Sequence, residues 1–368
     1  MDGGSKRVSE RAAVTALGLM SGTSLDGIDA AILRTDGERI VDIGPAETTA
    51  YEPAFRGRLR GLLGRLDDDE ETAEVARELT DLHARAVRTL LARAGARTGD
   101  VRLIGFHGHT VAHQPAKRIT RQIGDGAHLA RMTGITVVDD FRSRDVAGAG
   151  EGAPLAPLFH AALARDLEKP LCVLNLGGVA NVTYIAENGD VLAFDTGPGN
   201  ALLDDWMGRR AGTAYDAGGR LAASGHVNHD ALATLLQAPY FDRPPPKSLD
   251  RDAFGSGKLG ELASADGAAT LAAFTVEAVI RGTSFFPQAA RRWLVCGGGR
   301  RNETLMRGLA DSLKVAVEPV EAVGWLGDAL EAQAFAFLAV RSLYGLPISL
   351  PSTTGVERPL AGGTMHRP

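Results

Sequence analysis

The stretch of sequence that decides the fold spans residues 14–33 and reads VTALGLMSGTSLDGIDAAIL. Two apolar runs of strand length, 14–20 and 28–33, flank a turn built from glycine, serine, threonine and aspartate. A third apolar run over 40–49 follows an Asp-Gly turn. Three strand-length runs separated by turn residues predict a β-meander at the start of the chain.

The same order of elements occurs twice along the chain. After the meander, the first half predicts helices and strands over 53–66, 70–94, 101–106, 126–133 and 135–138. The second half predicts strands and helices over 171–176, 180–186, 191–194, 201–210, 268–281, 293–296, 303–313, 315–318 and 328–343. Each half therefore reads roughly β-β-β-α-β-α-β-α. The sequence predicts an α/β protein of two duplicated domains with a ligand cleft between them.

The domain boundaries follow from this repeat. We expect a disordered leader over 1–13, a first domain over 14–150 and a second domain over 151–346. A turn-rich insertion over 212–258 interrupts the second domain. The tail over 347–368 is expected to pack back on the first domain.

Composition excludes several classes of function. The 368 residues include 40 basic and 45 acidic side chains, a net charge of −5, which argues against nucleic acid and anionic membranes as partners. No apolar run reaches the ~18 residues of a membrane span, and the N-terminus lacks an apolar signal core. Two cysteines are too few for a disulfide framework or a structural zinc site, so we predict a cytoplasmic protein.

Glycine is the unusual component, with 45 of 368 residues against a typical ~7%. The glycines cluster at strand ends, in turns over 22–29, 195–200 and 297–302. Such turns aim several backbone N–H groups at one point, which suits phosphate, and the last two turns each precede a predicted helix whose N-terminus adds to the attraction. A Walker-type G-x-x-x-x-G-K string is missing, and 148–152 lacks the full G-x-G-x-x-G spacing, so those two nucleotide sites are excluded.

The motifs resemble one family along nearly the whole chain. They are GLMSGTSLDGIDAA (18–31), GFHGHTVAHQP (105–115), RQIGDGAHLA (121–130), VVDDFRSRDVA (137–147), EGAPLAPLFH (151–160), LNLGGVANVT (174–183), FDTGPGN (194–200), VCGGGRRNETLM (295–306) and GDALEAQAFAFLA (327–339). This set is similar to the anhydro-N-acetylmuramic acid kinase family, within the sugar kinase, Hsp70 and actin superfamily. Several positions depart from the expected patterns. Ser21 replaces the superfamily's aspartate, as it does in this family, and His109 and Glu151 stand where the family usually has glutamine. Ala149 stands where glycine is common, and KSLDRDAF (247–254) differs from the commoner KSTGRE-type string.

The resemblance implies a fold and a reaction. The fold is two RNase H-like domains of the actin and hexokinase type. The reaction opens the 1,6-anhydro bridge of anhydro-N-acetylmuramic acid with water and phosphorylates O6 with ATP, in recycling of cell-wall sugar. Asp195, which ends a strand and enters a glycine turn, is then the general base, with helix capping as the alternative. Glu331, in an otherwise apolar helix, is a second catalytic carboxylate or a residue at the solvent edge.

The resemblance also assigns ligands to the glycine turns. The residues expected to bind ATP are Gly22, Thr23, Ser24, Leu25, Asp26, Gly27, Ile28, Asp29, Gly177, Gly197, Gly199, Asn200, Gly297, Gly298, Gly299 and Asn302. Asp26 is also the expected ligand of Mg²⁺, because a hard cation prefers oxygen donors. Its alternative role is to cap the turn.

Two further segments are expected to bind the amino-sugar substrate. His107, Gly108 and Thr110 face the sugar by resemblance, as do Asp140 and Arg142. An arginine fork suits the lactyl carboxylate of muramic acid. The alternative for 139–145 is a solvated loop with internal salt bridges.

Other functions stay open at this point. One is another sugar or carboxylate kinase of the same fold, and another is a nucleotide-dependent switch. A third is a metal hydrolase, because His107 and His109 form an H-x-H pair of the kind that binds metals. A homodimer is a further open possibility.

Overall fold

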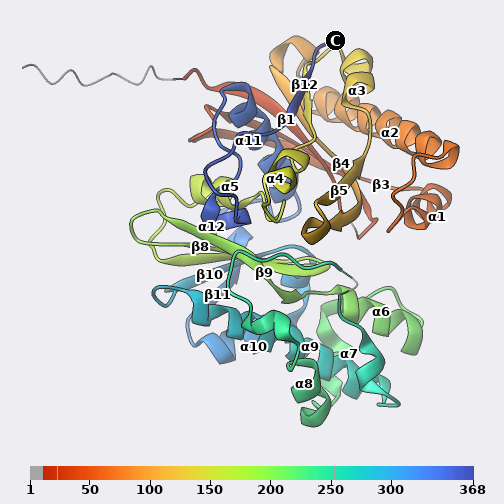
Figure 1. Cartoon of the computed structure of the whole chain (residues 1–368), viewed down its shortest axis with the longest axis vertical. Coiled ribbons are helices and arrows are strands. Elements are labelled where there is room, and N and C mark those ends of the chain that lie inside the picture. Colours follow the sequence, from red (N-terminus) through yellow and green to blue (C-terminus); the bar gives the residue numbers. More distant parts are fainter. Residues whose placement is uncertain (1–10, 23, 252) are drawn as a thin grey trace, which may run out of the picture.

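The computed structural model describes residues 11–22, 24–251 and 253–368 and folds them into two lobes around two mixed sheets (Figure 1). The first sheet contains β1 (Val14–Ser21), β2 (Gly27–Thr35), β3 (Ile40–Ala50), β4 (Leu103–Gln114), β5 (Ile119–Ile123), β6 (Val137–Asp139) and β12 (Thr364–His366). The second contains β7 (Leu171–Leu176), β8 (Val179–Ile185), β9 (Val191–Pro198), β10 (Arg292–Cys296) and β11 (Ala316–Pro319). The α/β fold class predicted from sequence is confirmed.

The two sheets share one topology. Their strand orders are β12-β6-β4-β1-β2-β3, with β5 beside β4, and β11-β10-β7-β8-β9. In the first, β1 runs antiparallel to β2 and parallel to β4. In the second, β7 runs antiparallel to β8 and parallel to β10. The same hairpin followed by the same parallel crossover in both halves is what a duplicated unit predicts.

Helices cover the sheets and fill the outer part of the second lobe. They are α1 (Pro53–Gly61), α2 (Glu70–Ala94), α3 (Gly126–Thr133), α4 (Ser143–Ala147), α5 (Pro157–Leu163), α6 (Ala201–Arg210), α7 (Arg220–Ser224), α8 (His229–Leu235), α9 (Ser264–Gly282), α10 (Glu303–Leu313), α11 (Leu330–Leu343) and α12 (Pro351–Thr354). Within the insertion over 212–258, α7 and α8 pack against α9.

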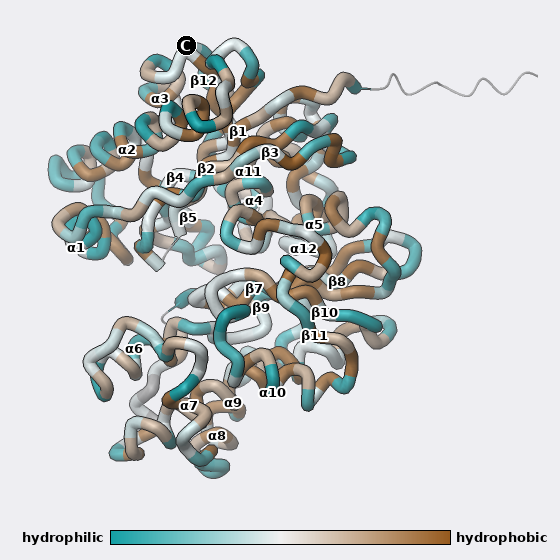
Figure 2. Tube along the Cα trace, turned by 180° about the vertical axis from the view of Figure 1, so that it is seen from behind, coloured by the Kyte–Doolittle hydropathy of each residue, from teal (hydrophilic) through white to brown (hydrophobic). Residues whose placement is uncertain are grey.

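Helix α2 shows how local sequence forms these elements. The Asp69 side chain accepts a hydrogen bond from the Thr72 N–H at the helix start, and Gly95 ends the helix in a left-handed conformation. Its apolar positions recur at helical spacing and are buried, so one face packs on the first sheet while the other stays hydrophilic (Figure 2).

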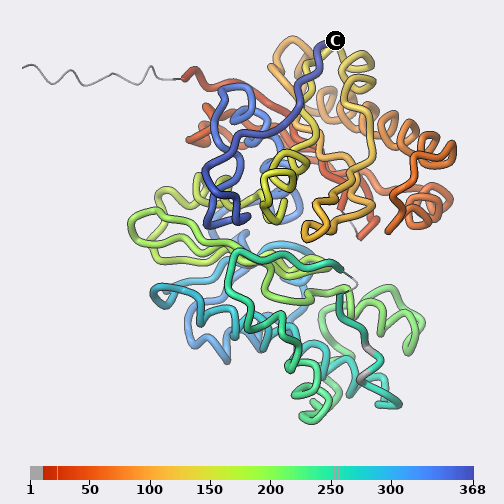
Figure 3. The backbone as a smooth tube through the Cα atoms, in the orientation of Figure 1, coloured from red at the N-terminus to blue at the C-terminus, as the bar shows by residue number. Residues whose placement is uncertain are grey.

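Helix α11 crosses from the second half of the sequence to the first lobe. It packs on β1, β2 and β4, as the blue end of the trace shows among the red and yellow segments (Figure 3). A Cβ atom on Gly18 would lie 1.7 Å from the carbonyl oxygen of Ala332, and one on Gly105 would lie 2.0 Å from that of Phe335. These glycines let the helix backbone lie directly on the strands. One apolar cluster around α11 therefore includes strands of both sheets.

Both ends of the described chain contact the first lobe. β12 pairs antiparallel with β6 near the C-terminus, and the Tyr344 hydroxyl donates to the carbonyl oxygen of Ala12. Residues 1–10 of the expected leader lie outside the described residues. Both α11 and the tail pack on the first lobe, although they follow residue 151 in the sequence. The domain boundaries expected at 150/151 and 346/347 stay a prediction.

The histidine motif lies in a strand and not in the loop expected after residue 106. β4 continues to Gln114 because β5, which the sequence did not predict, pairs with its second part. The polar histidines hide this extension from a hydrophobic pattern, and tertiary packing buries His107 and His109. Over the residues that the structure describes, no helix has the length and apolar character needed to cross a membrane.

Candidate active site

Charged side chains from both halves of the chain meet around Arg142, which follows β6 and precedes α4. Its guanidinium interacts with the carboxylates of Glu331 at the start of α11, Asp195 on β9 and Asp145 in α4. Loss of solvation lowers the pKa of Arg142, and the three carboxylates oppose that shift. Asp195 and Glu331, which lie far from Arg142 in the sequence, are thus within electrostatic reach of its guanidinium.

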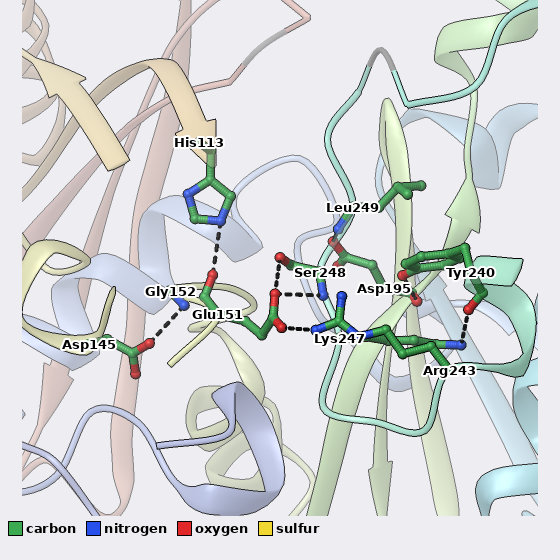
Figure 4. A network of polar contacts seen from close by, with 10 residues as sticks. All are labelled: His113, Asp145, Glu151, Gly152, Asp195, Tyr240, Arg243, Lys247, Ser248 and Leu249. Carbon is green, nitrogen blue, oxygen red and sulfur yellow. Dashed lines mark hydrogen bonds and ion pairs between the residues drawn. The ribbon is translucent and has the colours of Figure 1, made fainter. Parts of the chain in front are cut away.

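Asp195 lies near the end of β9 with its side chain buried. The backbone N–H of Leu249 donates to its Oδ2 at 2.8 Å, and its own N–H donates to the carbonyl oxygen of Lys247 at 2.9 Å (Figure 4). Burial raises the pKa of Asp195 to about 7; Leu249 and Arg142 lower it, and Glu151 raises it further. A carboxylate with a pKa near neutrality is suited to general base catalysis.

Glu331 occupies the first turn of α11 and is exposed between the two halves. The Asn175 amide donates to its Oε1 at 3.4 Å. The pKa of Glu331 is raised because the surrounding protein displaces bulk water, and because Asp29 carries a like charge nearby, whereas Arg142 lowers it. Its contacts with Asn175 and the nearby charges of Asp29 and Arg142 favour the interior position over the outer solvent edge.

His107 is held as a hydrogen-bond acceptor by Arg142. The guanidinium Nε and Nη2 atoms both lie 3.1 Å from Nε2 of His107, and Nη1 donates to the Gly152 carbonyl oxygen at 2.7 Å. Because an arginine can only donate, Nε2 is unprotonated and the proton sits on Nδ1, which donates to the Gly108 carbonyl oxygen at 3.0 Å. Burial and the arginine charge keep the pKa of His107 well below its ordinary value.

The H-x-H pair is not a metal site. The lone pair of His107 that would bind a cation already accepts from a guanidinium, whose positive charge would repel a metal. The His109 Nδ1 atom lies 2.8 Å from the hydroxyl of Ser21, which in turn lies 2.6 Å from that of Tyr51. Among the described residues, no group of three or more histidine, cysteine, aspartate or glutamate side chains could hold a metal ion. The arrangement of these two histidines therefore gives no support to the metal-hydrolase alternative.

The first glycine turn joins β1 to β2 at the inner end of the first sheet. Leu25 is buried with a left-handed φ of 61°, and its N–H donates to the Gly22 carbonyl oxygen at 3.0 Å. Ile28 is buried, while Ser24 and Asp26 are exposed, so hydroxyl and carboxylate oxygens reach solvent here. Thr23, which the sequence also assigned to ATP, lies outside the described residues.

Two aspartates follow this turn. The Asp26 carboxylate lies 3.5 Å from the Arg56 guanidinium and is otherwise open to solvent. Asp29 is half-buried, accepts from the Thr48 hydroxyl, and has its pKa raised to about 6 because of burial, with Asp328 and Asp26 adding to the shift. The turn therefore presents negative charge that a cation would neutralise.

Close backbone approach explains several of the other predicted glycines. A Cβ atom on Gly27 would lie 2.2 Å from the Thr49 carbonyl oxygen, and one on Gly199 would lie 2.3 Å from that of Gly177. Gly297 has a φ of 74°, which favours glycine. At Gly298 nothing lies within 4 Å of an added Cβ atom, so no contact inside the protein requires glycine there.

The other members of the two later turns have structural roles as well. A Cβ atom on Gly197 would lie 2.7 Å from Ala278, and one on Gly299 would lie 2.5 Å from Leu176. The Asn200 amide donates to the Leu176 carbonyl oxygen at 2.7 Å, and the Asn302 side chain caps α10. Since α6 begins at Ala201, Asp195 does not cap that helix.

The predicted sugar residues line one cavity only in part. A cavity of about 250 Å³ is lined by Phe106, His107, Gly108, Thr120, Arg121, Gln122, Ile123, Gly124, Asp139, Asp140 and Ser143. It thus includes three of the five predicted residues. Thr110 instead accepts from the Gln122 amide at 3.1 Å, and Arg142 does not line this cavity, although it contacts His107. Gln122 belongs to β5, which the hydrophobic pattern did not reveal.

A second cavity, of about 320 Å³, lies between the halves. Its walls are Asp29, Ala30, Ala46, Glu47 and Thr48 on one side and Glu321, Leu326, Gly327, Asp328 and Ala329 on the other. It adjoins the first glycine turn through Asp29 and the start of α11 through Ala329. Of the predicted nucleotide residues, only Asp29 lines it.

The comparisons with known proteins agree with the motifs. The family model described as anhydro-N-acetylmuramic acid kinase matches residues 14–367. The chain is 56% identical to the anhydro-N-acetylmuramic acid kinase of Rhodospirillum rubrum, over 96% of this chain and 94% of that protein. It is 56% identical to the one of Paramagnetospirillum magneticum, over 96% and 99%. Among solved structures, it is similar to a ROK family glucokinase from Streptomyces griseus in complex with glucose and AMPPNP, at 15% identity over 88% of this chain and 98% of that one, with a TM-score of 0.41.

The family model covers both lobes of the structure, over residues 14–367. Identity above 50% over nearly the whole chain leaves no part of the two lobes unaccounted for. The chain belongs to the anhydro-N-acetylmuramic acid kinase family.

Proposed function

We propose that Asp195 is the general base of a reaction in which water opens the 1,6-anhydro bridge of anhydro-N-acetylmuramic acid and ATP phosphorylates O6. The observation that carries this role is the buried carboxylate of Asp195, which accepts a hydrogen bond from the Leu249 N–H and has its pKa raised to about 7 by burial. Family membership supports the reaction, and the position of Asp195 supports the role.

The proposed step balances in atoms and charge. The Asp195 carboxylate takes a proton from water, whose oxygen forms a bond to the anomeric carbon. The bond from that carbon to the bridging O6 breaks, and O6 attacks the γ-phosphorus of ATP. The bond between the γ-phosphorus and the oxygen that joins it to the β-phosphorus of ATP breaks, which releases ADP. Because the departing sugar oxygen is itself the phosphate acceptor, one carboxylate suffices for the proton transfer.

The residues around the glycine turns fit ATP and Mg²⁺. Gly298 leaves a space that a side chain would fill, and Ser24 places a hydroxyl at the exposed first turn. The exposed carboxylate of Asp26 offers the oxygen donor that Mg²⁺ prefers. We propose that Asp26 holds the ion, which would neutralise phosphate charge. Glu331, beside Arg142 and Asn175, would orient the attacking water.

Replacing Gly298 with alanine tests the nucleotide site. Because nothing in the protein lies within 4 Å of the new methyl group, the midpoint of thermal unfolding is expected to stay unchanged. A ligand that approaches the backbone here meets the methyl group, so we expect KM for ATP to rise about tenfold, a loss of about 1.4 kcal/mol. Steady-state kinetics at varied ATP would measure it. An unchanged KM for ATP would remove Gly298 from the site.

Arg142 and the first cavity supply the proposed sugar contacts. His107, Gly108 and Asp140 line a space of about 250 Å³, the size class of a small ligand rather than a polymer. Arg142 carries a charge that attracts a carboxylate, and the lactyl group of the substrate has one. We propose that Arg142 pairs with it. Thr110 would contribute indirectly, because its hydroxyl accepts a hydrogen bond from the Gln122 amide and Gln122 lines the cavity.

The pH dependence of the reaction follows from the pKa of Asp195. A base must be ionised to take a proton, and burial raises the pKa of Asp195 to about 7. The value of kcat/KM for the sugar is therefore expected to fall as pH drops below about 7, tenfold per unit. An ordinary aspartate would give this fall near pH 4. A profile that is flat from pH 8 down to pH 5 would exclude Asp195 as the base.

The proposed reaction is tested by incubating the purified chain with ATP, Mg²⁺ and 1,6-anhydro-N-acetylmuramic acid. We expect ADP and N-acetylmuramic acid 6-phosphate in equal amounts, detected by chromatography and mass spectrometry. N-Acetylmuramic acid without the anhydro bridge is the matched control. If only the control is phosphorylated, the chain is another sugar kinase of this fold.

We further propose that the protein works in the cytoplasm. Cys172 and Cys296 are both buried free thiols, which is compatible with a reducing compartment. A homodimer stays a prediction, and size-exclusion chromatography with light scattering would measure the mass of the particle.

A further inference from the structure

Glu151 links the two halves of the chain through its backbone and its side chain. Its backbone is fixed to the first lobe, where its N–H donates to the Thr354 carbonyl oxygen at 2.6 Å and its carbonyl oxygen lies 2.9 Å from Nε2 of His113. The neighbouring Gly152 N–H donates to the buried Asp145 carboxylate at 2.7 Å. The backbone around residue 151 is thus firmly held (Figure 4).

The side chain of Glu151 reaches the insertion of the second half. One carboxylate oxygen pairs with the Arg243 guanidinium. The other accepts from the Ser248 hydroxyl at 2.6 Å and from the Ser248 N–H at 3.3 Å. The Glu151 side chain is only 16% exposed, so these contacts are largely shielded from water. Both carboxylate oxygens therefore bind the segment that runs from 243 to 249.

This same segment holds Asp195. The carbonyl oxygen of Lys247 accepts from the Asp195 N–H at 2.9 Å, and the Leu249 N–H donates to the Asp195 carboxylate at 2.8 Å. Ser248, which Glu151 binds, lies between these two contacts in the chain. A change in the position of Ser248 would therefore move the group that holds the Asp195 backbone and the group that holds its carboxylate.

The Lys247 side chain, next to Ser248 in the chain, attaches the segment to the second lobe. The Lys247 Nζ atom donates to the carbonyl oxygens of Tyr240 and Phe241 at 3.0 and 3.3 Å. It also lies 4.7 Å from the ring centre of Tyr240 and 4.8 Å from that of Phe285, within reach of cation–π attraction. Lys247 keeps the segment on the second lobe, while Glu151 determines how it lies relative to the first.

We propose that Glu151 is a positioning residue of this kinase, which holds Arg243 and Ser248 across the two halves and thereby fixes the segment that orients the carboxylate of Asp195. The proposal rests on Asp195 being the general base. Residue 151 is a position where the family pattern leads one to expect glutamine. The negative charge of Glu151 would then help to raise the pKa of the base.

The charges of Glu151 and Arg243 should affect the pKa of Asp195, which a purely structural contact would not do. The charged groups that act on Asp195 are Arg142, which lowers its pKa, and Glu151, which raises it. Arg243 pairs with Glu151 and so partly neutralises it. Of the other groups packed here, His113 is neutral because burial lowers its pKa to about 4. Removing the charge of Glu151 should therefore lower the pKa of Asp195, whereas removing the charge of Arg243 should raise it.

The test compares Glu151→Gln with Arg243→Gln in the full chain, with ATP, Mg²⁺ and the anhydro-sugar. Both variants loosen the segment, so kcat at pH 8.5 is expected to fall about tenfold in each, the size of effect a misplaced catalytic group produces. The acidic limb of kcat/KM is expected to move to lower pH in Glu151→Gln and to higher pH in Arg243→Gln. Ser248→Ala, which removes a hydrogen bond but no charge, should lower kcat and leave the limb in place.

The outcomes separate this proposal from the one on which it rests. If both glutamine variants keep the limb of the unmodified protein, or move it in the same direction, Glu151 does not set the base and the inference is overturned. If Asp195→Asn stays active, it is the role of Asp195 that fails. Circular dichroism and thermal unfolding of each variant show whether a loss of kcat comes from a misfolded chain, in which case the shift of the limb in the remaining folded fraction still decides.

Discussion

Replacing Asp195 with asparagine is expected to lower kcat by about two orders of magnitude or more, while both substrates still bind. Asparagine has almost the same shape and can still accept the hydrogen bond that the Leu249 N–H donates. It cannot take a proton from water, so only the chemical step suffers. Steady-state kinetics gives kcat, and calorimetric titration with the sugar and with a non-hydrolysable ATP analogue gives the two affinities.

The stability of the same variant separates lost chemistry from lost structure. The pKa of Asp195 rises from 3.8 to about 7 on folding, so the folded state binds a proton more tightly than the unfolded state. The ionised side chain therefore destabilises the fold progressively as pH rises from about 4 to about 7, and fully above that. Asparagine carries no charge, and its midpoint of unfolding at pH 8 should be no lower than that of the unmodified protein. A variant that keeps near-normal turnover would contradict the assignment of Asp195.

Replacing Gly18 with alanine is expected to destabilise the fold by about 3 kcal/mol or more, because overpacking against a rigid backbone is costly. The new Cβ atom would lie 1.7 Å from the Ala332 carbonyl oxygen and 2.7 Å from the Ala336 backbone nitrogen. No side-chain rotation relieves that clash, so α11 must move away from β1. Chemical denaturation would measure the free energy of unfolding, and activity should fall too because Glu331 lies in the first turn of the same helix.

Gly57 provides the matched control for this substitution. It lies inside α1, and nothing is within 4 Å of an added Cβ atom. Alanine there should stabilise the protein by roughly 0.5–1 kcal/mol, since glycine costs about that much in a helix interior. Equal free energies of unfolding for the Gly18 and Gly57 variants would show that α11 does not pack on the first sheet as closely as the structure has it.

Much of the candidate site was proposed from local pattern. Asp195 stood out because a carboxylate that ends a strand and enters a glycine turn lies where ligands bind in α/β folds. The prediction of paired glycine turns was of the same kind, although Gly27 and Gly199 proved to serve close backbone approach. Glu151 could only be noted as unusual, because its partners Arg243 and Ser248 lie about a hundred residues further along the chain.

The sequence by itself determined the family, the α/β class and the duplicated order of strands and helices, and it singled out the carboxylate that we propose as the base. These features are carried by residues that are close together in the chain, where periodicity and turn chemistry operate. Only the tertiary structure decided that α11 returns to the first lobe, that the histidines of β4 are buried and held neutral, and that Glu151 spans the halves. Such features depend on long-range packing and on the removal of water from charged groups, and no local pattern encodes either.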